Sequence, residues 1–90
     1  MSTYPPPVPK PSNAGTAKTA IVVPRGSYVN LRNGPGTNYQ DIGDIYRSTL
    51  VAYYPATRRS DGWIWVEQYG VGGWIFTGVV ELEDVAAPAP

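Results

Sequence analysis

Apolar and polar residues alternate in short runs along the middle of the chain, and turn-forming residues separate the runs. In residues 28–32, Val29 and Leu31 share one face while Asn30 and Arg32 share the other. Such alternation, without a sustained helical period, is typical of strands that are buried on one side. The pattern predicts one tight helical turn at residues 77–79 and strands at residues 20–23, 28–32, 41–46, 50–54, 63–67, 74–76 and 80–82.

The segments between these runs are rich in glycine and other turn formers. Residues 33–38 (Asn-Gly-Pro-Gly-Thr-Asn) predict a loop, residues 57–62 a polar turn, and residues 70–73 a Gly-rich hairpin turn. Nine of the ten glycines lie between residues 19 and 85. Because glycine tolerates the bulges and corners of a strongly bent sheet, we expect an all-β fold in the form of a small barrel.

Proline marks the two ends of the chain. Seven of the ten prolines lie in the first eleven residues or the last three. Segments this poor in large apolar residues bury too little surface to offset the entropy lost on ordering them. We therefore expect a disordered Pro-rich linker at residues 1–18, one folded domain at residues 19–85, and an Ala/Pro linker at residues 86–90.

Composition excludes several classes of function. The seven basic and seven acidic side chains give a net charge of zero, which argues against nucleic acid as a partner. No apolar stretch is long enough for membrane insertion, and the proline-rich start does not resemble a signal peptide. Cysteine and histidine are absent, so we expect no cofactor, no metal site and no catalytic residue of the Ser-His-Asp or Cys-His kind. The acidic residues are interpreted as solvated strand edges, and the chain is not expected to be an enzyme.

Residues 29–39, Val-Asn-Leu-Arg-Asn-Gly-Pro-Gly-Thr-Asn-Tyr, resemble the bacterial SH3 (SH3b) family pattern, roughly L-N-V-R-S-G-P-S-T-S-Y. Residues 41–45, 61–66 and 73–75 are similar to the segments that follow in that family, in the same order and spacing. The resemblance implies an SH3-like barrel of five to six short antiparallel strands, with a single tight helical turn before the last strand. Bacterial SH3 modules usually accompany cell-wall hydrolases or other envelope proteins, and several bind peptidoglycan or its peptide bridges. The resemblance therefore also implies a targeting or scaffolding module that is not itself a catalyst.

The segment after the second predicted strand has the composition of a stiff loop. Pro35 fixes its own φ and keeps Gly34 out of the helical region, while Gly36 permits a positive φ. Tyr39 can lay its ring along the loop. By resemblance, Arg32 braces the loop through hydrogen bonds to backbone carbonyls.

Strand alternation also assigns faces to the aromatic residues. It places Ile64, Val66 and Ile75 inward and the three tryptophans outward. An outward aromatic cluster indicates either a binding surface or rings that cover the hydrophobic floor under a loop, and for Trp74 both readings stay open. We expect a groove between the loop at residues 33–39 and the strand that bears Trp63. The candidate ligand-binding residues are Asn33, Tyr39, Tyr54, Asp61, Trp63, Trp65 and Trp74.

Three hypotheses for function remain. The first is a cell-envelope module that recognises peptidoglycan or a peptide in it, as a monomeric domain of a larger, extracellular or envelope protein. The second is a protein-protein module for proline-rich peptides, with residues 4–11 of this chain as one candidate ligand. Against the second, Phe76 and Val79 stand where eukaryotic SH3 domains usually have Pro and Tyr. The third is a structural spacer.

Overall fold

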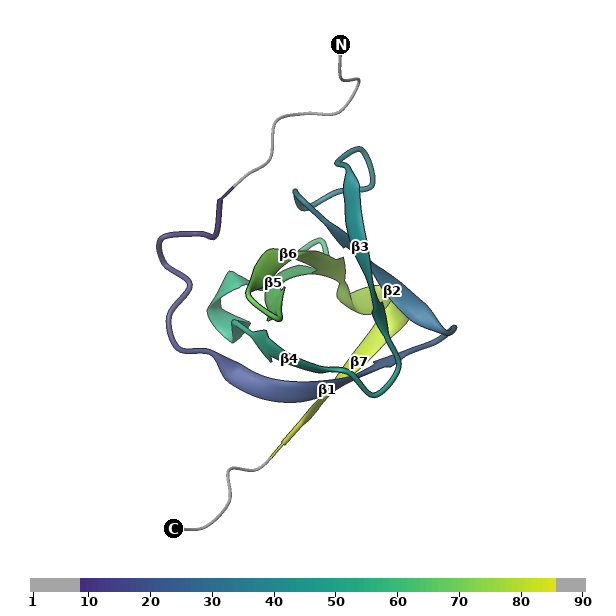
Figure 1. The fold of residues 1–90 in the computed structure, drawn as a ribbon. Coiled ribbons are helices and arrows are strands. Elements are labelled where there is room, and N and C mark those ends of the chain that lie inside the picture. Colours follow the sequence, from purple (N-terminus) through teal and green to yellow (C-terminus); the bar gives the residue numbers. More distant parts are fainter. Residues whose placement is uncertain (1–8, 86–90) are drawn as a thin grey trace, which may run out of the picture.

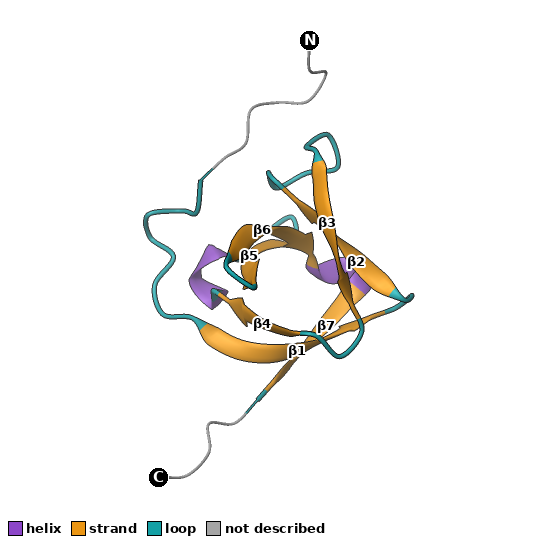
Figure 2. Ribbon diagram, in the orientation of Figure 1, coloured by secondary structure: helices purple, strands orange, loops and turns teal. Residues whose placement is uncertain are grey.

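Every predicted run of alternating residues forms a strand. The computed structural model describes residues 9–85 and arranges the strands in one antiparallel sheet that curls round on itself (Figures 1 and 2). Along the sheet the order is β3-β2-β6-β5-β4-β1-β7. The strands are β1 (Lys18–Pro24), β2 (Tyr28–Arg32), β3 (Asp41–Tyr46), β4 (Leu50–Tyr53), β5 (Trp63–Gln68), β6 (Val71–Phe76) and β7 (Val80–Asp84).

The predicted all-β class and the seven strands read from the alternation are confirmed, but the closed barrel of five to six strands implied by the family resemblance is not. The two short runs at residues 41–46 and 80–82 both form full strands, since β3 pairs with β2 and β7 pairs with β1. In the described part of the chain β3 and β7 are edge strands that do not pair with each other, so the sheet is curled without being closed. The predicted helical turn is confirmed as the 3-10 turn η2 (Thr77–Val79). A second such turn, η1 (Pro55–Thr57), begins at a proline, which is favourable at that position.

The β5–β6 hairpin is tighter than the sequence suggested. Only Tyr69 and Gly70 form the turn, with φ angles of 51° and 81°, and Gln68 pairs with Val71. Two successive residues with positive φ are the signature of a type I′ turn, whose twist matches that of the strands it joins. Residues 71–73 therefore belong to β6, and the expected turn at residues 70–73 is wrong.

The interior contains the aliphatic residues that alternation assigned to it. Ile64 is 2% exposed, while Val66 and Ile75 are completely buried. The cluster they form is made of Val22, Val29, Leu31, Ile45, Val51, Ile64, Val66, Ile75 and Val80. The loops and the outer aromatic residues pack around this core.

The loop after β2 is braced as expected. The Arg32 guanidinium donates to the carbonyl oxygens of Tyr39 (2.9 Å) and Thr37 (3.4 Å), and the Tyr39 ring covers Gly34 so closely that a Cβ there would lie 2.0 Å from it. The expectation that Gly36 adopts a positive φ is wrong, because its φ is not positive. A Cβ at Gly36 would lie 2.6 Å from Oδ1 of the exposed Asn38, so only that side chain would have to move.

Residues 9–17 pass beside η1 before β1 begins at Lys18 (Figure 2). Ala14 is only 4% exposed, and Gly15, with φ 74°, lies against the Ala56 side chain. This part of the expected linker is thus placed against η1, while residues 1–8 and 86–90 lie outside the described residues. The boundaries at 18/19 and 85/86 stay predictions. No helix within residues 9–85 has the length and apolar character needed to cross a membrane.

Candidate functional site

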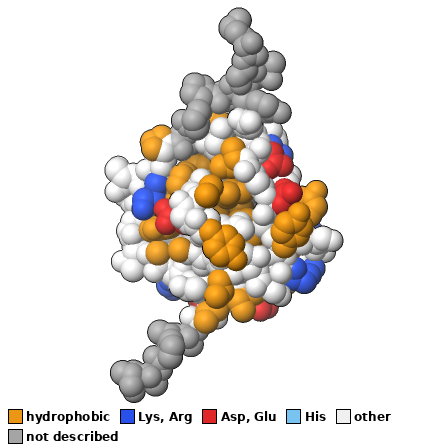
Figure 3. Space-filling view, in the orientation of Figure 1, with side chains coloured by type: hydrophobic (Ala, Val, Ile, Leu, Met, Phe, Trp, Pro, Cys, Tyr) orange, Lys and Arg blue, Asp and Glu red, His pale blue; other side chains and the backbone are white. Residues whose placement is uncertain are grey.

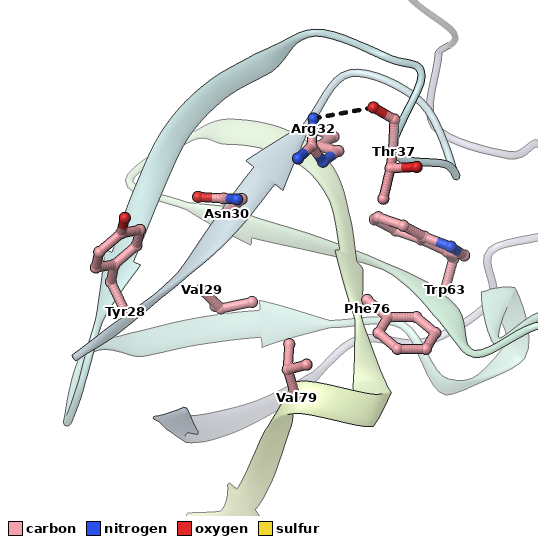
Figure 4. Close-up of a pocket in the computed structure, with 8 residues that line it drawn as sticks. All are labelled: Tyr28, Val29, Asn30, Arg32, Thr37, Trp63, Phe76 and Val79. Atoms are coloured by element: carbon pink, nitrogen blue, oxygen red, sulfur yellow. Dashed lines mark hydrogen bonds between the residues drawn. The ribbon is translucent and has the colours of Figure 1, made fainter. Parts of the chain in front are cut away.

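An open groove of about 440 Å³ runs between β2, the braced loop and the end of β6 (Figure 4). Four of its residues come from β2, one from the loop, and the others from the start of β5, the end of β6 and η2. They are Tyr28, Val29, Asn30, Arg32, Thr37, Trp63, Phe76 and Val79. The groove lies between the loop and the strand bearing Trp63, which is where the sequence placed it.

A pair of aromatic rings forms the apolar part of the groove. Trp63 and Phe76 are cross-strand partners, with ring centroids 5.5 Å apart and planes inclined by 46°. Phe76 fits between two glycines, since a Cβ at Gly62 or Gly78 would come within 2.8 Å or 2.4 Å of its ring. Trp63 is 8% exposed and Phe76 is 37% exposed, so Phe76 offers more of its surface to a ligand.

The opposite wall is partly polar. Within residues 9–85 both hydrogen bonds of the Arg32 guanidinium come from Nη1, which leaves Nε and Nη2 free to donate to a ligand. One end of the Asn30 side-chain amide lies 3.2 Å from a carboxylate oxygen of Asp41 and 3.2 Å from one of Asp44, and these two acceptors assign the amide nitrogen to that end. Tyr28, 49% exposed, closes this wall and leans on Tyr46, with 5.8 Å between the ring centroids. The groove therefore combines an aromatic floor with a fixed cationic group.

Figure 3 shows apolar side chains gathered over the middle of one face of the molecule, with charged groups nearer its edge. Among the candidate residues from the sequence, only Trp63 lines the groove. Trp65 and Trp74 are 6% and 5% exposed and form a second cluster with Trp63, against which Tyr54 packs. The three tryptophans lie outside the main core, as alternation predicted, but their rings cover one another there, so the covering reading fits Trp65 and Trp74 better than an exposed surface.

Tyr54 belongs to a polar arrangement at the edge of this second cluster. Its hydroxyl donates to Glu67 Oε1 (3.0 Å), while the Trp65 indole Nε1 donates to Glu67 Oε2 (3.3 Å). Lys10 Nζ lies 3.5 Å from Glu67 Oε2 and 4.7 Å from the centre of the Tyr54 ring. Desolvation opposes ionisation of Glu67, but the hydrogen bonds from Trp65 and Tyr54, together with Lys10, prevail and hold its pKa below the usual 4.5.

The remaining candidates lie beside the groove without lining it. Asn33 is 9% exposed and its backbone N–H donates to the Gln40 carbonyl (3.0 Å). Tyr39 is half-buried over Gly34. Asp61 is exposed and pairs with Arg59 at 3.2 Å, and the hydrogen bond from that guanidinium holds the Asp61 pKa below its usual 3.8. Their roles in binding stay predictions.

Most residues of the groove were not predicted from the sequence. Tyr28 and Asn30 lie on the same side of β2 as Arg32, so their position could have been read from strand alternation. Phe76 and Val79 were singled out only as departures from the eukaryotic SH3 pattern. A two-residue turn at Tyr69-Gly70 pairs Phe76 with Trp63 across the strands, so recognising that turn would have placed Phe76 beside Trp63.

Comparison with known proteins adds one match. A family model for the bacterial SH3 domain matches residues 27–81. The searches of curated proteins and of solved structures found no match. Within residues 9–85 the structure contains no group of three or more acidic, cysteine or histidine side chains arranged to hold a metal ion.

Proposed function

The chain belongs to the bacterial SH3 domain family, and we propose that it is a non-catalytic module that binds the peptide part of peptidoglycan. Membership of the family supports a binding role in general. The peptide ligand, a location in the cell envelope or outside the cell, and a place as one monomeric domain in a larger protein are parts of the proposal.

The observation that carries the proposal is the pairing of an aromatic floor with a fixed guanidinium in one open groove. The peptides of peptidoglycan present small aliphatic side chains and free carboxylates. The Trp63–Phe76 pair suits the former, and the free Nε and Nη2 of Arg32 suit the latter. Because Arg32 is already held by two carbonyls of the loop, little entropy is lost when it engages a carboxylate.

Proline-rich peptides are the second candidate, because a groove with exposed aromatic rings also suits a polyproline II helix. Residues 4–11 of this chain are less favoured as its ligand in the same molecule. The described part of that segment places Lys10 on Tyr54 and Glu67, outside the groove.

Co-sedimentation with purified peptidoglycan tests the proposal. Tyr28→Ala is expected to weaken binding about tenfold, because it removes the exposed aromatic ring that closes the polar wall of the groove. Tyr46→Ala is the matched control, since Tyr46 is 57% exposed and belongs to the same ring pair but does not line the groove. Its binding is expected to equal that of the wild type.

The outcomes separate the three hypotheses. If the wild type stays in the supernatant, the peptidoglycan proposal is wrong. If a soluble peptide with the sequence of residues 4–11 then binds in a Tyr28-dependent way, the proline-rich ligand is favoured. If neither ligand binds, the spacer hypothesis gains.

A further inference from the structure

We propose that Tyr54 and Glu67 form a second binding site, which takes the side-chain ammonium of a lysine in an extended peptide, and that Lys10 fills this site in the present chain. Lys10 Nζ lies 3.4 Å from the Tyr54 hydroxyl, 3.5 Å from Glu67 Oε2 and 4.7 Å from the centre of the Tyr54 ring. None of these three residues lines the groove of Trp63, so the inference does not depend on the function proposed for that groove.

The receptor half of the site is held in place by groups other than the lysine. One oxygen of Glu67 accepts from the Tyr54 hydroxyl and the other from the Trp65 indole. Trp65 is fixed in turn, because it is 6% exposed and packs edge-on against Trp74. The carboxylate therefore keeps its position when no ammonium is present, and such preorganisation lowers the entropy lost on binding.

The chemistry of the site selects an ammonium group. A carboxylate attracts any cation, but the adjacent face of the Tyr54 ring adds a cation–π interaction, and its hydroxyl oxygen accepts a hydrogen bond from the bound amine. The prolines on both sides of Lys10 favour an extended backbone. The matching ligand is thus a lysine side chain presented by an extended peptide.

The resident lysine can be exchanged without opening the core. The Lys10 side chain is 43% exposed, and the segment that carries it is anchored further along the chain at Ala14, which is 4% exposed. Release of Lys10 therefore leaves the anchor and β1 in place. A tethered group acts as a competitor at an effective concentration in the millimolar range, so removal of the Lys10 ammonium should expose the site to ligands in solution.

The test uses the full chain labelled with ¹⁵N and follows the Trp65 indole N–H, which donates to Glu67. Lys10→Ala should shift this resonance, and N-acetyl-lysine amide at millimolar concentration should move it back towards its wild-type position in a saturable manner. N-acetyl-norleucine amide, which lacks the ammonium, should have no effect. Lys18→Ala, which removes a lysine that makes neither contact, should leave the resonance unchanged.

A second variant separates the site from non-specific binding. Adding Glu67→Gln to Lys10→Ala should weaken lysine binding at least about threefold, as expected for the loss of one exposed ion pair with its hydrogen bond. If Glu67→Gln alters the fold, Tyr54→Phe is the second variant, since it removes the hydroxyl that accepts from the bound amine and should also weaken lysine binding. An indole resonance that does not respond to Lys10→Ala, or lysine binding that is equal with and without Glu67, would overturn the proposal. Neither result bears on peptidoglycan binding at Tyr28, so the two proposals can fail independently.

Discussion

Trp65 and Trp74 are cross-strand partners that meet edge to face, with ring centroids 5.7 Å apart and planes inclined by 84°. Both are nearly buried although they lie on the outer face of the sheet. A pair in this geometry contributes about 0.5–1.5 kcal/mol beyond the burial of its surface. The outer cluster is therefore a second source of stability for a domain too small to rely on a single core.

Gly72→Ala should destabilise the domain by about 1–3 kcal/mol, the usual range for overpacking. The added Cβ would lie 2.3 Å from the Trp65 ring, which would have to leave its present position against Trp74. Gly43→Ala is the matched control, because Gly43 also lies in a strand and a Cβ there meets nothing within 4 Å. Urea unfolding of both variants measures the difference, and equal midpoints would show that the packing of Trp65 on Gly72 contributes nothing.

Thr57→Val should cost about 1–3 kcal/mol in unfolding free energy. The Thr57 hydroxyl donates to the Tyr54 carbonyl (2.7 Å) and accepts from the Trp65 backbone N–H (2.9 Å), and Thr57 is 6% exposed. Valine has a similar shape but leaves that N–H without its partner. Thr19→Val, at an exposed position of β1, should change the stability little. Unfolding free energies that match for the two variants would contradict this account of η1.

Tyr69→Asn should stabilise the domain by roughly 0.5–1 kcal/mol. Tyr69 has φ 51°, a conformation that asparagine tolerates better, and its side chain is 88% exposed, so few contacts are lost. Thermal unfolding would show a higher midpoint for the variant. A lower midpoint would mean that the Tyr69 ring stabilises the hairpin in some way that its exposure does not suggest.

Stability should fall in acid partly through Glu67. Its pKa is lower in the folded protein than the usual 4.5, so its contribution is fully present above pH 4.5 and is lost as the pH falls through the folded value. In Glu67→Gln this component should be missing from the pH dependence of the urea midpoint below 4.5. Lys10→Met should raise the Glu67 pKa, measured by NMR titration of its carboxyl carbon, while Lys18→Met should leave it unchanged. A Glu67 pKa that is the same in all three proteins would contradict the contact with Lys10.

The strands were predictable because a period of two leaves little freedom in where Val29, Leu31, Ile64, Val66 and Ile75 point. Alternation does not show whether the side chains on the outer face of the sheet are buried by their neighbours. Alternation put Trp65 outside the core correctly, but its burial depends on which residue of β6 faces it. That register is set by a two-residue turn at Tyr69-Gly70, a pair that lacks the asparagine or aspartate typical of type I′ turns.

In the candidate site, too, one part could be predicted from the sequence and another could not. The groove was placed correctly between the loop and Trp63, because the motif of residues 29–39 fixes the loop. Its aromatic floor was not predicted, since the β5–β6 register is needed to place Phe76 opposite Trp63. The contact between Lys10 and Glu67 could not be predicted, because composition marks the start of the chain as a linker and does not show where it lies.

Chemical-shift mapping with a soluble peptidoglycan peptide tests the central claim most directly. The claim is that this domain binds such a peptide in the groove between β2 and Phe76. The largest saturable shifts are expected at the Trp63 indole N–H and at the backbone amides of Tyr28, Thr37 and Phe76, with little change at the Trp65 indole. Shifts confined to Trp65 and Glu67, or no shifts at all, would contradict the claim.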